Sequence, residues 1–219
     1  MTHRFPPGKV PWDKIAEKVR TKLPPEVILG PALGEDAALV KIGGEIWAVA
    51  SDPITFTSKG AGRLSVIVNA NDIVVRGATP LYYVAVVLVS PADAEDKYVG
   101  ATLDEIREAC DSLGVALIGG HTEVSPGLPH TVIVGTMLGK VTGRTITTGG
   151  LRAGDLVGAT KWAGLEGTSI ILSEFGERLR QIHGVAPFAE AEKILGKEWL
   201  GHDWRGHEWL SVVPEATIA

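Results

Sequence analysis

The chain has 219 residues, of which 45% are hydrophobic and 21% charged, a composition typical of a globular protein with one or two domains. The formal net charge of −5 argues against a nucleic-acid-binding surface, which usually shows as an excess of basic residues. The longest apolar run, residues 81–89, is too short to cross a bilayer, so we expect no membrane partner.

The single cysteine, Cys110, lies in a stretch with helical periodicity. It cannot form an intrachain disulfide, and the first residues are polar and interrupted by prolines, unlike the apolar core of a signal peptide. We therefore expect a cytoplasmic protein whose only thiol is buried and unreactive.

The N-terminal region predicts one amphipathic helix over residues 11–23, because Trp12, Ile15, Val19 and Leu23 recur at helical spacing. The prolines that follow end this helix. Basic residues near the N-terminus alternate with acidic ones, which we interpret as a solvated helix face.

A tight β-hairpin follows. Two apolar runs, residues 37–42 and 45–54, are joined by Gly43-Gly44, and such a pair predicts two antiparallel strands. If the turn is centred on the two glycines, Ile42 opposes Glu45 and the register of the whole hairpin is fixed.

Two acidic side chains lie at the open end of this hairpin. Counting back from the turn places Asp36 opposite Ser51, with Asp52 one residue further. Neighbouring like charges are costly unless a cation lies between them, and Mg²⁺ prefers carboxylate oxygens. The alternative is that both aspartates are turn or cap residues, since glycine and proline flank them.

A polar stripe marks the next helix. The segment N-A-N-D-I-V-V-R-G-A-T-P, residues 69–80, places Asn69, Asp72 and Arg76 at positions i, i+3 and i+7, and Gly77 ends the helix. A polar stripe on an apolar helix needs a partner. A solvated face or a local salt bridge is the alternative interpretation.

The loop before this helix, residues 58–62, contains glycines. A glycine loop that leads into a helix N-terminus can hold an anion with its backbone N–H groups. The loop matches neither the P-loop nor the Rossmann fingerprint, so it is weak evidence for a phosphate site.

Strands and helices alternate through the following residues. We expect strands at 81–90, 115–118 and 131–141, and a helix at 92–113. The polar segment G-G-H-T-E, residues 119–123, would then lie at the end of a strand. This alternation predicts an α/β domain whose sheet is covered on one face.

A glycine- and threonine-rich stretch near residue 145 suggests a domain boundary. We divide the chain into a first domain, residues 1–145, and the start of a second, residues 146–219, which we expect to be incomplete. In the second part we expect a strand at 156–160 and helices at 170–182, 187–200 and 211–219.

Four segments carry a resemblance: Gly34-Glu35-Asp36-Ala37-Ala38, Ser51-Asp52, Asn69–Pro80 and Gly119–Glu123. In this order they resemble the signature segments of the aminoimidazole ribonucleotide (AIR) synthetase, or PurM-like, superfamily. This superfamily also includes thiamine monophosphate kinase, selenophosphate synthetase and the hydrogenase maturation protein HypE. Two further segments are most similar to the HypE-like branch: Lys161–Ser169 and Ser211–Ala219.

The resemblance implies an α/β (α+β) fold. Its N-terminal domain would pair its sheet across a two-fold axis into a barrel in the homodimer, with a PurM-like C-terminal domain beside it. It implies binding of ATP and Mg²⁺ and phosphoryl transfer to an acceptor that the sequence does not identify. The alternatives are a thiamine monophosphate kinase-like enzyme and a non-catalytic dimeric scaffold.

The resemblance also implies site residues, although it names no catalytic one. The metal ligands would be Asp36, Asp52, Asp72 and Glu123. The nucleotide-binding residues would be Asn69, Asn71, Asp72, Gly119, Gly120 and Thr122. One departure matters: His121 stands where the kinase and HypE branches usually carry an acid, which weakens a metal assignment at that position.

Overall fold

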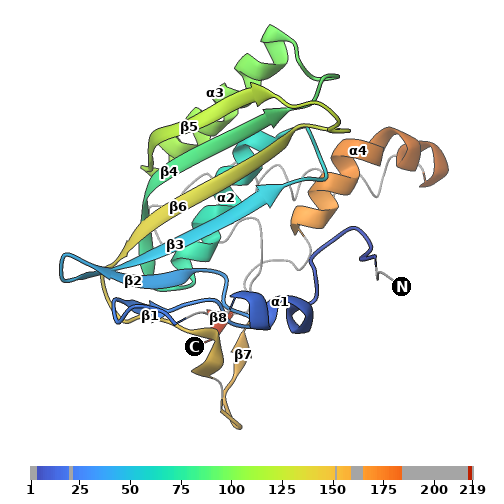
Figure 1. The fold of residues 1–219 in the computed structure, drawn as a ribbon. Helices are drawn as coiled ribbons and strands as arrows, with labels where there is room; N and C mark the ends of the chain where they lie inside the picture. The colour runs from blue at the N-terminus through green and yellow to red at the C-terminus, as the bar shows by residue number, and fades with distance from the viewer. Residues whose placement is uncertain (1–3, 20–21, 151, 159–164, 184–216, 219) are drawn as a thin grey trace.

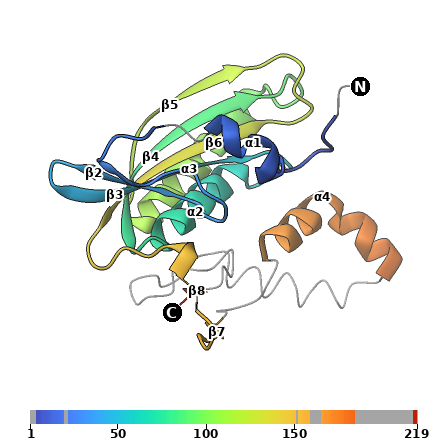
Figure 2. The same ribbon diagram turned by 60° about the horizontal axis from the view of Figure 1, so that its bottom comes forward.

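The computed structural model describes residues 4–19, 22–150, 152–158, 165–183 and 217–218. Helices α2 (Ala61–Val74) and α3 (Asp96–Leu113) cover one face of a mixed six-stranded sheet (Figures 1 and 2), so the predicted α/β class is confirmed. The strands, in spatial order, are β1 (Val27–Leu29), β2 (Ala38–Ile42), β3 (Glu45–Ile54), β6 (Val132–Val141), β4 (Ala78–Val89) and β5 (Ala116–Val124).

The β2–β3 hairpin has the predicted register. Ile42 pairs with Glu45 across the two turn glycines, and the antiparallel ladder continues to Ala38, which pairs with Val49. Gly43 and Gly44 have φ values of 58° and 88°, the left-handed conformation that such a tight turn requires. Strand β1, which pairs with β2, was not predicted because it has only three residues.

Helix α2 crosses the middle of the sheet and is almost entirely buried. It begins at Ala61, inside the glycine-containing loop expected at residues 58–62, directly after Gly60, whose φ is 65°. It ends at Val74, earlier than predicted, and a turn follows in which Gly77 has a φ of 74°. The helix packs on the sheet, chiefly against β3 and β6, and against its neighbour α3.

Helix α3 begins at Asp96 rather than near residue 92 and ends with Gly114 in the left-handed conformation, as the glycine predicted. Cys110 lies on its buried side with 1% of its surface exposed, so the prediction of a buried cysteine is confirmed. Burial raises the pKa of the thiol to about 12. The nucleophilic thiolate is therefore scarce at neutral pH.

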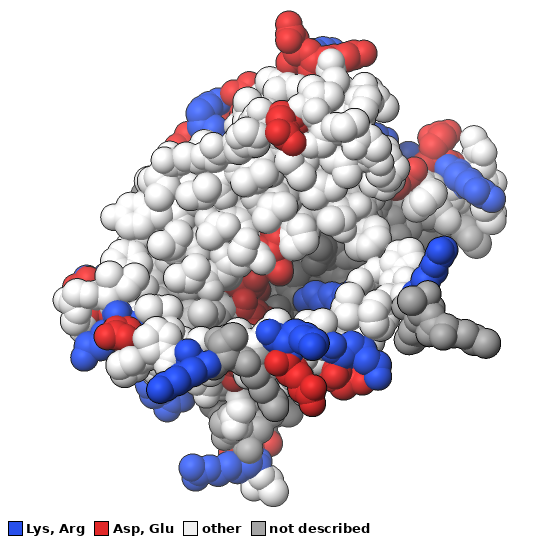
Figure 3. All heavy atoms as spheres, in the orientation of Figure 1, with Lys and Arg blue, Asp and Glu red and all other residues white. Residues whose placement is uncertain are grey.

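The two faces of the sheet differ in what covers them. On β3, Ala48, Ala50 and Ile54 are buried on the helix side, while Trp47 lies on the opposite, open face. There its ring stacks on that of Tyr82 in β4 with centroids 6.1 Å apart. The open face is largely uncharged over the middle of the sheet (Figure 3).

The remaining elements are α1 (Trp12–Val19), η1 (Thr148–Gly150), β7 (Val157–Gly158), α4 (Leu165–His183) and β8 (Thr217–Ile218). Helix α1 ends before the predicted residue 23. Strand β8 pairs antiparallel with β7, so the prediction of a helix at 211–219 is wrong for these two residues. The helix predicted at 187–200 lies outside the described residues. The domain division at residue 145 stays a prediction.

No described helix is long and apolar enough to span a bilayer. The polar segment 119–123 lies inside β5 and not at a strand end, which corrects the sequence prediction. Gly120 approaches the neighbouring strand β4 closely, since a Cβ atom there would collide with the backbone carbonyl of Ala85. The barrel expected in a dimer stays a prediction.

Gly135 in β6 gives a testable consequence of this packing. A Cβ atom at this position would collide with the hydroxyl of Tyr83 and the amide nitrogen of Asn69. We expect Gly135→Ala to lower the free energy of unfolding by about 1–3 kcal/mol, measured by urea denaturation, because overpacking displaces buried side chains. Gly143→Ala is the control, since open space surrounds Gly143. Equal stability of the two variants would contradict this packing.

Candidate functional site

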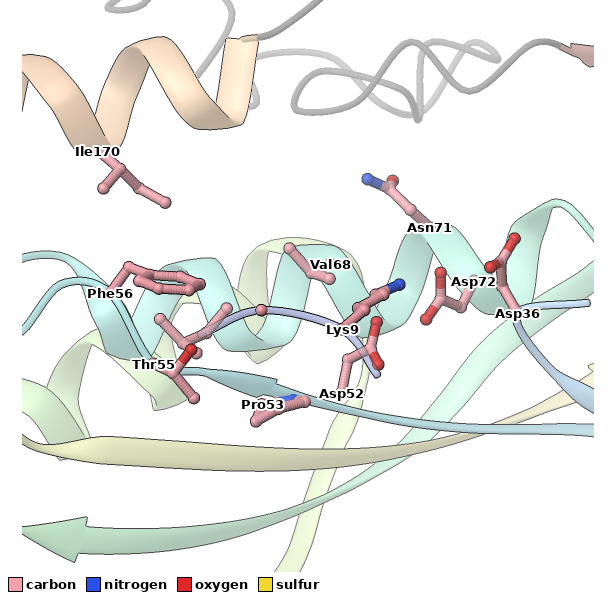
Figure 4. Close-up of a pocket in the computed structure, with 12 residues that line it drawn as sticks. Lys9, Asp36, Asp52, Pro53, Thr55, Phe56, Val68, Asn71, Asp72 and Ile170 are labelled. Atoms are coloured by element: carbon pink, nitrogen blue, oxygen red, sulfur yellow. The ribbon is translucent and has the colours of Figure 1, made fainter. Parts of the chain in front are cut away.

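A cavity of about 570 Å³ lies on the helix side of β3, a volume within the usual range for small-molecule sites (Figure 4). Three carboxylates line it, each from a different element: Asp36 from the loop before β2, Asp52 from β3 and Asp72 from α2. The other lining residues are Gly8, Lys9, Pro53, Ile54, Thr55, Phe56, Val68, Asn71 and Ile170. The cavity therefore has an acidic end and an apolar end.

Asp52 faces α2 because alternate residues of β3 point to the helix side of the sheet. Asn69 of α2 fixes this part of the strand. Its Oδ1 accepts a hydrogen bond from the backbone N–H of Asp52 at 2.9 Å, and its Nδ2 donates to the Asp52 carbonyl at 3.2 Å. Asn69 is completely buried and does not line the cavity. It positions a carboxylate and makes no direct contact with the cavity.

Asp72 and Asn71 enter the cavity from α2. Asp72 lies one turn after Asn69 and is 4% exposed, while Asn71 is 3% exposed. In the described part of the chain, the side-chain nitrogen of Asn71 has no hydrogen-bond partner. A buried N–H group without a partner costs about 1–3 kcal/mol. Asn71 thus offers a donor to a ligand oxygen in the cavity.

Asp36 is held near α2 by a buried ion pair next to it in sequence. Glu35 and Arg76 form this pair at 2.5 Å, with side chains 7% and 1% exposed. The Glu35 carboxylate also accepts a hydrogen bond from the backbone N–H of Thr148 at 3.2 Å. Of the predicted polar stripe, Asp72 therefore lines the cavity, whereas Arg76 makes a salt bridge that anchors the loop before β2.

The donor set suits a hydrated cation better than a closed metal cage. No three His, Cys, Asp or Glu side chains among the described residues are close enough to form a preassembled metal cluster. Mg²⁺ usually binds one or two carboxylates and completes its shell with water and substrate phosphates. Three carboxylates around one cavity fit this mode, since a phosphate oxygen can bridge the space between them.

The segment at Gly119–Glu123 lies elsewhere. Its strand, β5, is at the edge of the sheet, and all nine residues are exposed. The ladders place Asp52 in one row with Gly135, Ala85 and Gly120. Three strand spacings of about 4.8 Å separate Asp52 from Gly120 by about 14 Å. The chain alone does not bring these predicted site residues to the acidic cavity.

Gly119, Gly120 and Thr122 line a second hollow of about 460 Å³ between β5 and α3. Glu123 instead contacts two residues that are close to it in sequence. Its carboxylate accepts a hydrogen bond from the Ser125 hydroxyl at 2.7 Å and forms another with Nε2 of His121 at 3.1 Å. The Ser125 hydroxyl and then His121 lower the pKa of Glu123. The carboxylate is also exposed at the surface of β5.

Comparison with known proteins identifies the region around the cavity. Residues 34–141 match the family described as AIR synthase related protein, N-terminal domain. These residues belong to that family. The predicted membership of the AIR synthetase superfamily is therefore confirmed, and the matched AIR synthase-related domain contains Asp36, Asp52 and Asp72.

Two curated relatives are similar to the chain. A phosphoribosylformylglycinamidine cyclo-ligase of Thermococcus kodakarensis is 28% identical over 152 residues, which cover 64% of this chain and 45% of the relative. A hydrogenase expression/formation protein of Methanocaldococcus jannaschii is 30% identical over 148 residues, 65% of this chain and 44% of the relative. The chain thus spans about half the length of the curated relatives it matches.

Two solved structures share the fold. One is the protein AaThiL complexed with AMPPCP and TMP, with a TM-score of 0.60 and 21% identity over 74% of this chain and 50% of that one. The other is the hydrogenase maturation protein HypE in complex with ATP, with a TM-score of 0.55 and 24% identity over 67% of this chain and 46% of that one. The PurM-like fold of the domain is confirmed by these likenesses.

The glycine loop before α2 does not offer a free anion site in the AIR synthase-related domain. The backbone N–H of Gly62 donates to the carboxylate of Glu105 from α3 at 3.1 Å. Burial raises the pKa of Glu105, although hydrogen bonds from the N–H groups of Gly62 and Arg63 oppose the shift. A protein carboxylate therefore occupies the place that the sequence suggested for a phosphate.

Sequence reasoning missed two residues of the site. Lys9 was assigned to a solvated helix face, yet it precedes α1 and lines the cavity. Glu35 was noted only as part of a turn motif, although its partner Arg76 was recognised as polar. The Glu35–Arg76 pair could have been suspected, because both residues carry opposite charges and stand in apolar stretches of the sequence. No signal in the sequence could have found the first.

Asp93 gives a pH-dependent prediction, because it ties the loop after β3 to the neighbouring strands. Its Oδ2 accepts hydrogen bonds from Ser58, Ser90 and Thr131. Burial raises its pKa, but these hydrogen bonds outweigh burial and leave it below the usual 3.8.

The stability that Asp93 contributes is therefore fully present above pH 3.8 and is lost as the pH falls through the lower, folded-state pKa. We expect Asp93→Asn to lower the urea midpoint at pH 7, with the gap from wild type narrowing below pH 4. A gap that stays constant down to pH 3 would contradict the role of the charge.

Proposed function

We propose that the chain binds ATP and Mg²⁺ in the acidic cavity. The observation that carries this proposal is the convergence of three carboxylates from separate elements on one cavity. Asp36, Asp52 and Asp72 would hold the cation, and the free N–H of Asn71 would donate to a nucleotide oxygen. When bound, Mg²⁺ would neutralise charge on the phosphates, which is much of what phosphoryl transfer requires.

The reaction we propose is an ATP-dependent phosphoryl transfer of the HypE type. Hydrogenase-maturation proteins are among the relatives by sequence and among the structures that share the fold. In this chain the work of the protein residues is to position the nucleotide and to keep its phosphates oriented between β3 and α2. The acceptor is not specified by the described residues.

We also propose that the chain acts as a homodimer. The open sheet face is uncharged over its middle and carries Trp47 and Tyr82, a surface suited to burial against a second copy. Gly119, Gly120, Thr122 and Glu123 lie about 14 Å or more from Asp52 within one chain. Their predicted contact with nucleotide or metal therefore requires a second copy to bring them there.

A thiamine monophosphate kinase-like activity is the second candidate. It is supported by the structural likeness to AaThiL with AMPPCP and TMP, and by a thiamine-monophosphate kinase of Archaeoglobus fulgidus among the relatives. Incubation with ATP, Mg²⁺ and thiamine phosphate distinguishes this kinase activity from the HypE-type activity, because only the kinase forms thiamine diphosphate.

Isothermal titration of ATP into the chain, with and without Mg²⁺, tests the proposal. We expect binding with Mg²⁺ and at least about tenfold weaker binding with EDTA, because the carboxylates repel bare phosphates. Tripolyphosphate serves as the comparison for the phosphate contribution. Absence of binding in both conditions would contradict the nucleotide site and favour a non-catalytic dimeric scaffold.

A further inference from the structure

The N-terminal segment before α1 brings a positive charge to the acidic cavity. Gly8 and Lys9 line the cavity together with the three aspartates. More than twenty residues separate Lys9 from Asp36, the nearest of these three in sequence. In Figure 4 the side chain of Lys9 extends toward the carboxylates of Asp52 and Asp72. Among the described residues that line this cavity, Lys9 is the one basic residue.

The geometry of the segment directs this side chain. Gly8 has a φ of 122°, a conformation that residues with a Cβ atom rarely adopt. The chain therefore turns at Gly8 just before Lys9 and then enters α1 at Trp12. In the described part of the chain Lys9 forms no ion pair, so its ammonium group remains available to a ligand.

We propose that Lys9 is a phosphate ligand, whose ammonium group binds a phosphate oxygen of the nucleotide from the side opposite α2. This inference rests on the proposed nucleotide site. The described side chains that line the cavity include three carboxylates and one ammonium group, so their net charge is negative and favours a divalent cation. Once the cation and phosphates are present, Lys9 gains a charged acceptor, and such hydrogen bonds are among the strong ones.

This role predicts opposite effects on two ligands. Removing the positive charge makes the cavity more negative, so Lys9→Ala should bind Mn²⁺ alone as tightly as wild type or more tightly. The same variant should bind ATP with Mg²⁺ about ten- to a hundredfold more weakly, because one charged hydrogen bond is lost. A merely structural role for Lys9 would weaken both.

The experiment measures Mn²⁺ by electron paramagnetic resonance and ATP with Mg²⁺ by titration calorimetry, for wild type, Lys9→Ala and Lys9→Arg. Lys14→Ala is the matched control, since Lys14 lies on α1, pairs with Asp13 and does not line the cavity. We expect Lys9→Arg to keep most of the affinity for ATP, and Lys14→Ala to bind both ligands like wild type.

Two outcomes separate the failure of this inference from that of the proposed function. Unchanged ATP binding by Lys9→Ala, beside normal wild-type binding, would overturn the role of Lys9 and leave the nucleotide site standing. Equal losses in Lys9→Ala and Lys14→Ala would overturn it too, as a general charge effect. Absence of binding by wild type would overturn the nucleotide site and Lys9's role together.

Discussion

Asp72→Asn is expected to weaken binding of ATP with Mg²⁺ by at least about a hundredfold, since even outer-shell changes around a metal typically cost ten- to a hundredfold. The substitution removes one negative charge from the acidic end of the cavity and changes the shape of the side chain very little. Asp72 is 4% exposed, so few water molecules can replace the lost ligand. Titration calorimetry with and without Mg²⁺ measures the effect.

The control for this variant is Asp111→Asn. Asp111 lies on the exposed side of α3, within reach of Arg107, and away from the cavity. The Asp111→Asn protein should bind ATP as tightly as wild type does. Circular dichroism and the urea midpoint confirm that Asp72→Asn is folded. Wild-type affinity in a folded Asp72→Asn protein would contradict a cation site at this residue.

Arg76→Met is expected to lower the free energy of unfolding by about 3–5 kcal/mol, because it leaves the Glu35 carboxylate buried without its charged partner. Glu35→Gln should cost less, since an amide oxygen can still accept from Arg76. In the described part of the chain, two further Arg76 nitrogens, Nε and Nη2, have no hydrogen-bond partner. The pair is therefore imperfectly satisfied even in the wild type.

The double variant Glu35→Leu/Arg76→Met tests the cause. Replacing both charges by apolar side chains removes the unpaired ion, so we expect it to recover most of the stability lost in Arg76→Met. Arg107→Ala, which breaks exposed pairs only, should change stability by less than about 1 kcal/mol. A double variant less stable than Arg76→Met would show that the ion pair itself stabilises the fold.

The effect of the Glu35–Arg76 pair on the acidic cavity can be measured as a change in ATP affinity, separately from its effect on stability. Glu35 precedes Asp36, and the ion pair holds the loop before β2 against α2. We therefore expect the folded double variant to bind ATP with Mg²⁺ less tightly than wild type. Stability and ligand affinity would then change independently, as they should when a residue positions a ligand without contacting it.

Much of the fold followed from local sequence signals. The glycine pair predicted the β2–β3 register, and counting from it placed Asp52 beside Ser51, one residue beyond the position opposite Asp36. Short elements such as β1 escaped notice, because three residues carry too little periodicity to identify a strand. Helix ends were placed within a few residues.

The site was only partly predictable. Counting from the hairpin turn brought Asp36 and Asp52 together, the resemblance added Asp72, and all three line the cavity. The stripe could not reveal that Asn69 binds the backbone of Asp52, since that contact joins two elements. Nor could spacing along the chain place Glu123 at the far edge of the sheet, because strand order is a property of the whole fold.

The most direct test of the central claim is anomalous diffraction from Mn²⁺ in crystals of the chain grown with AMPPCP. We expect a Mn²⁺ peak in the cavity, in contact with at least two of the carboxylates of Asp36, Asp52 and Asp72 and with the phosphates. A peak bound only at Glu123 on β5, or nucleotide bound outside the cavity, would contradict it.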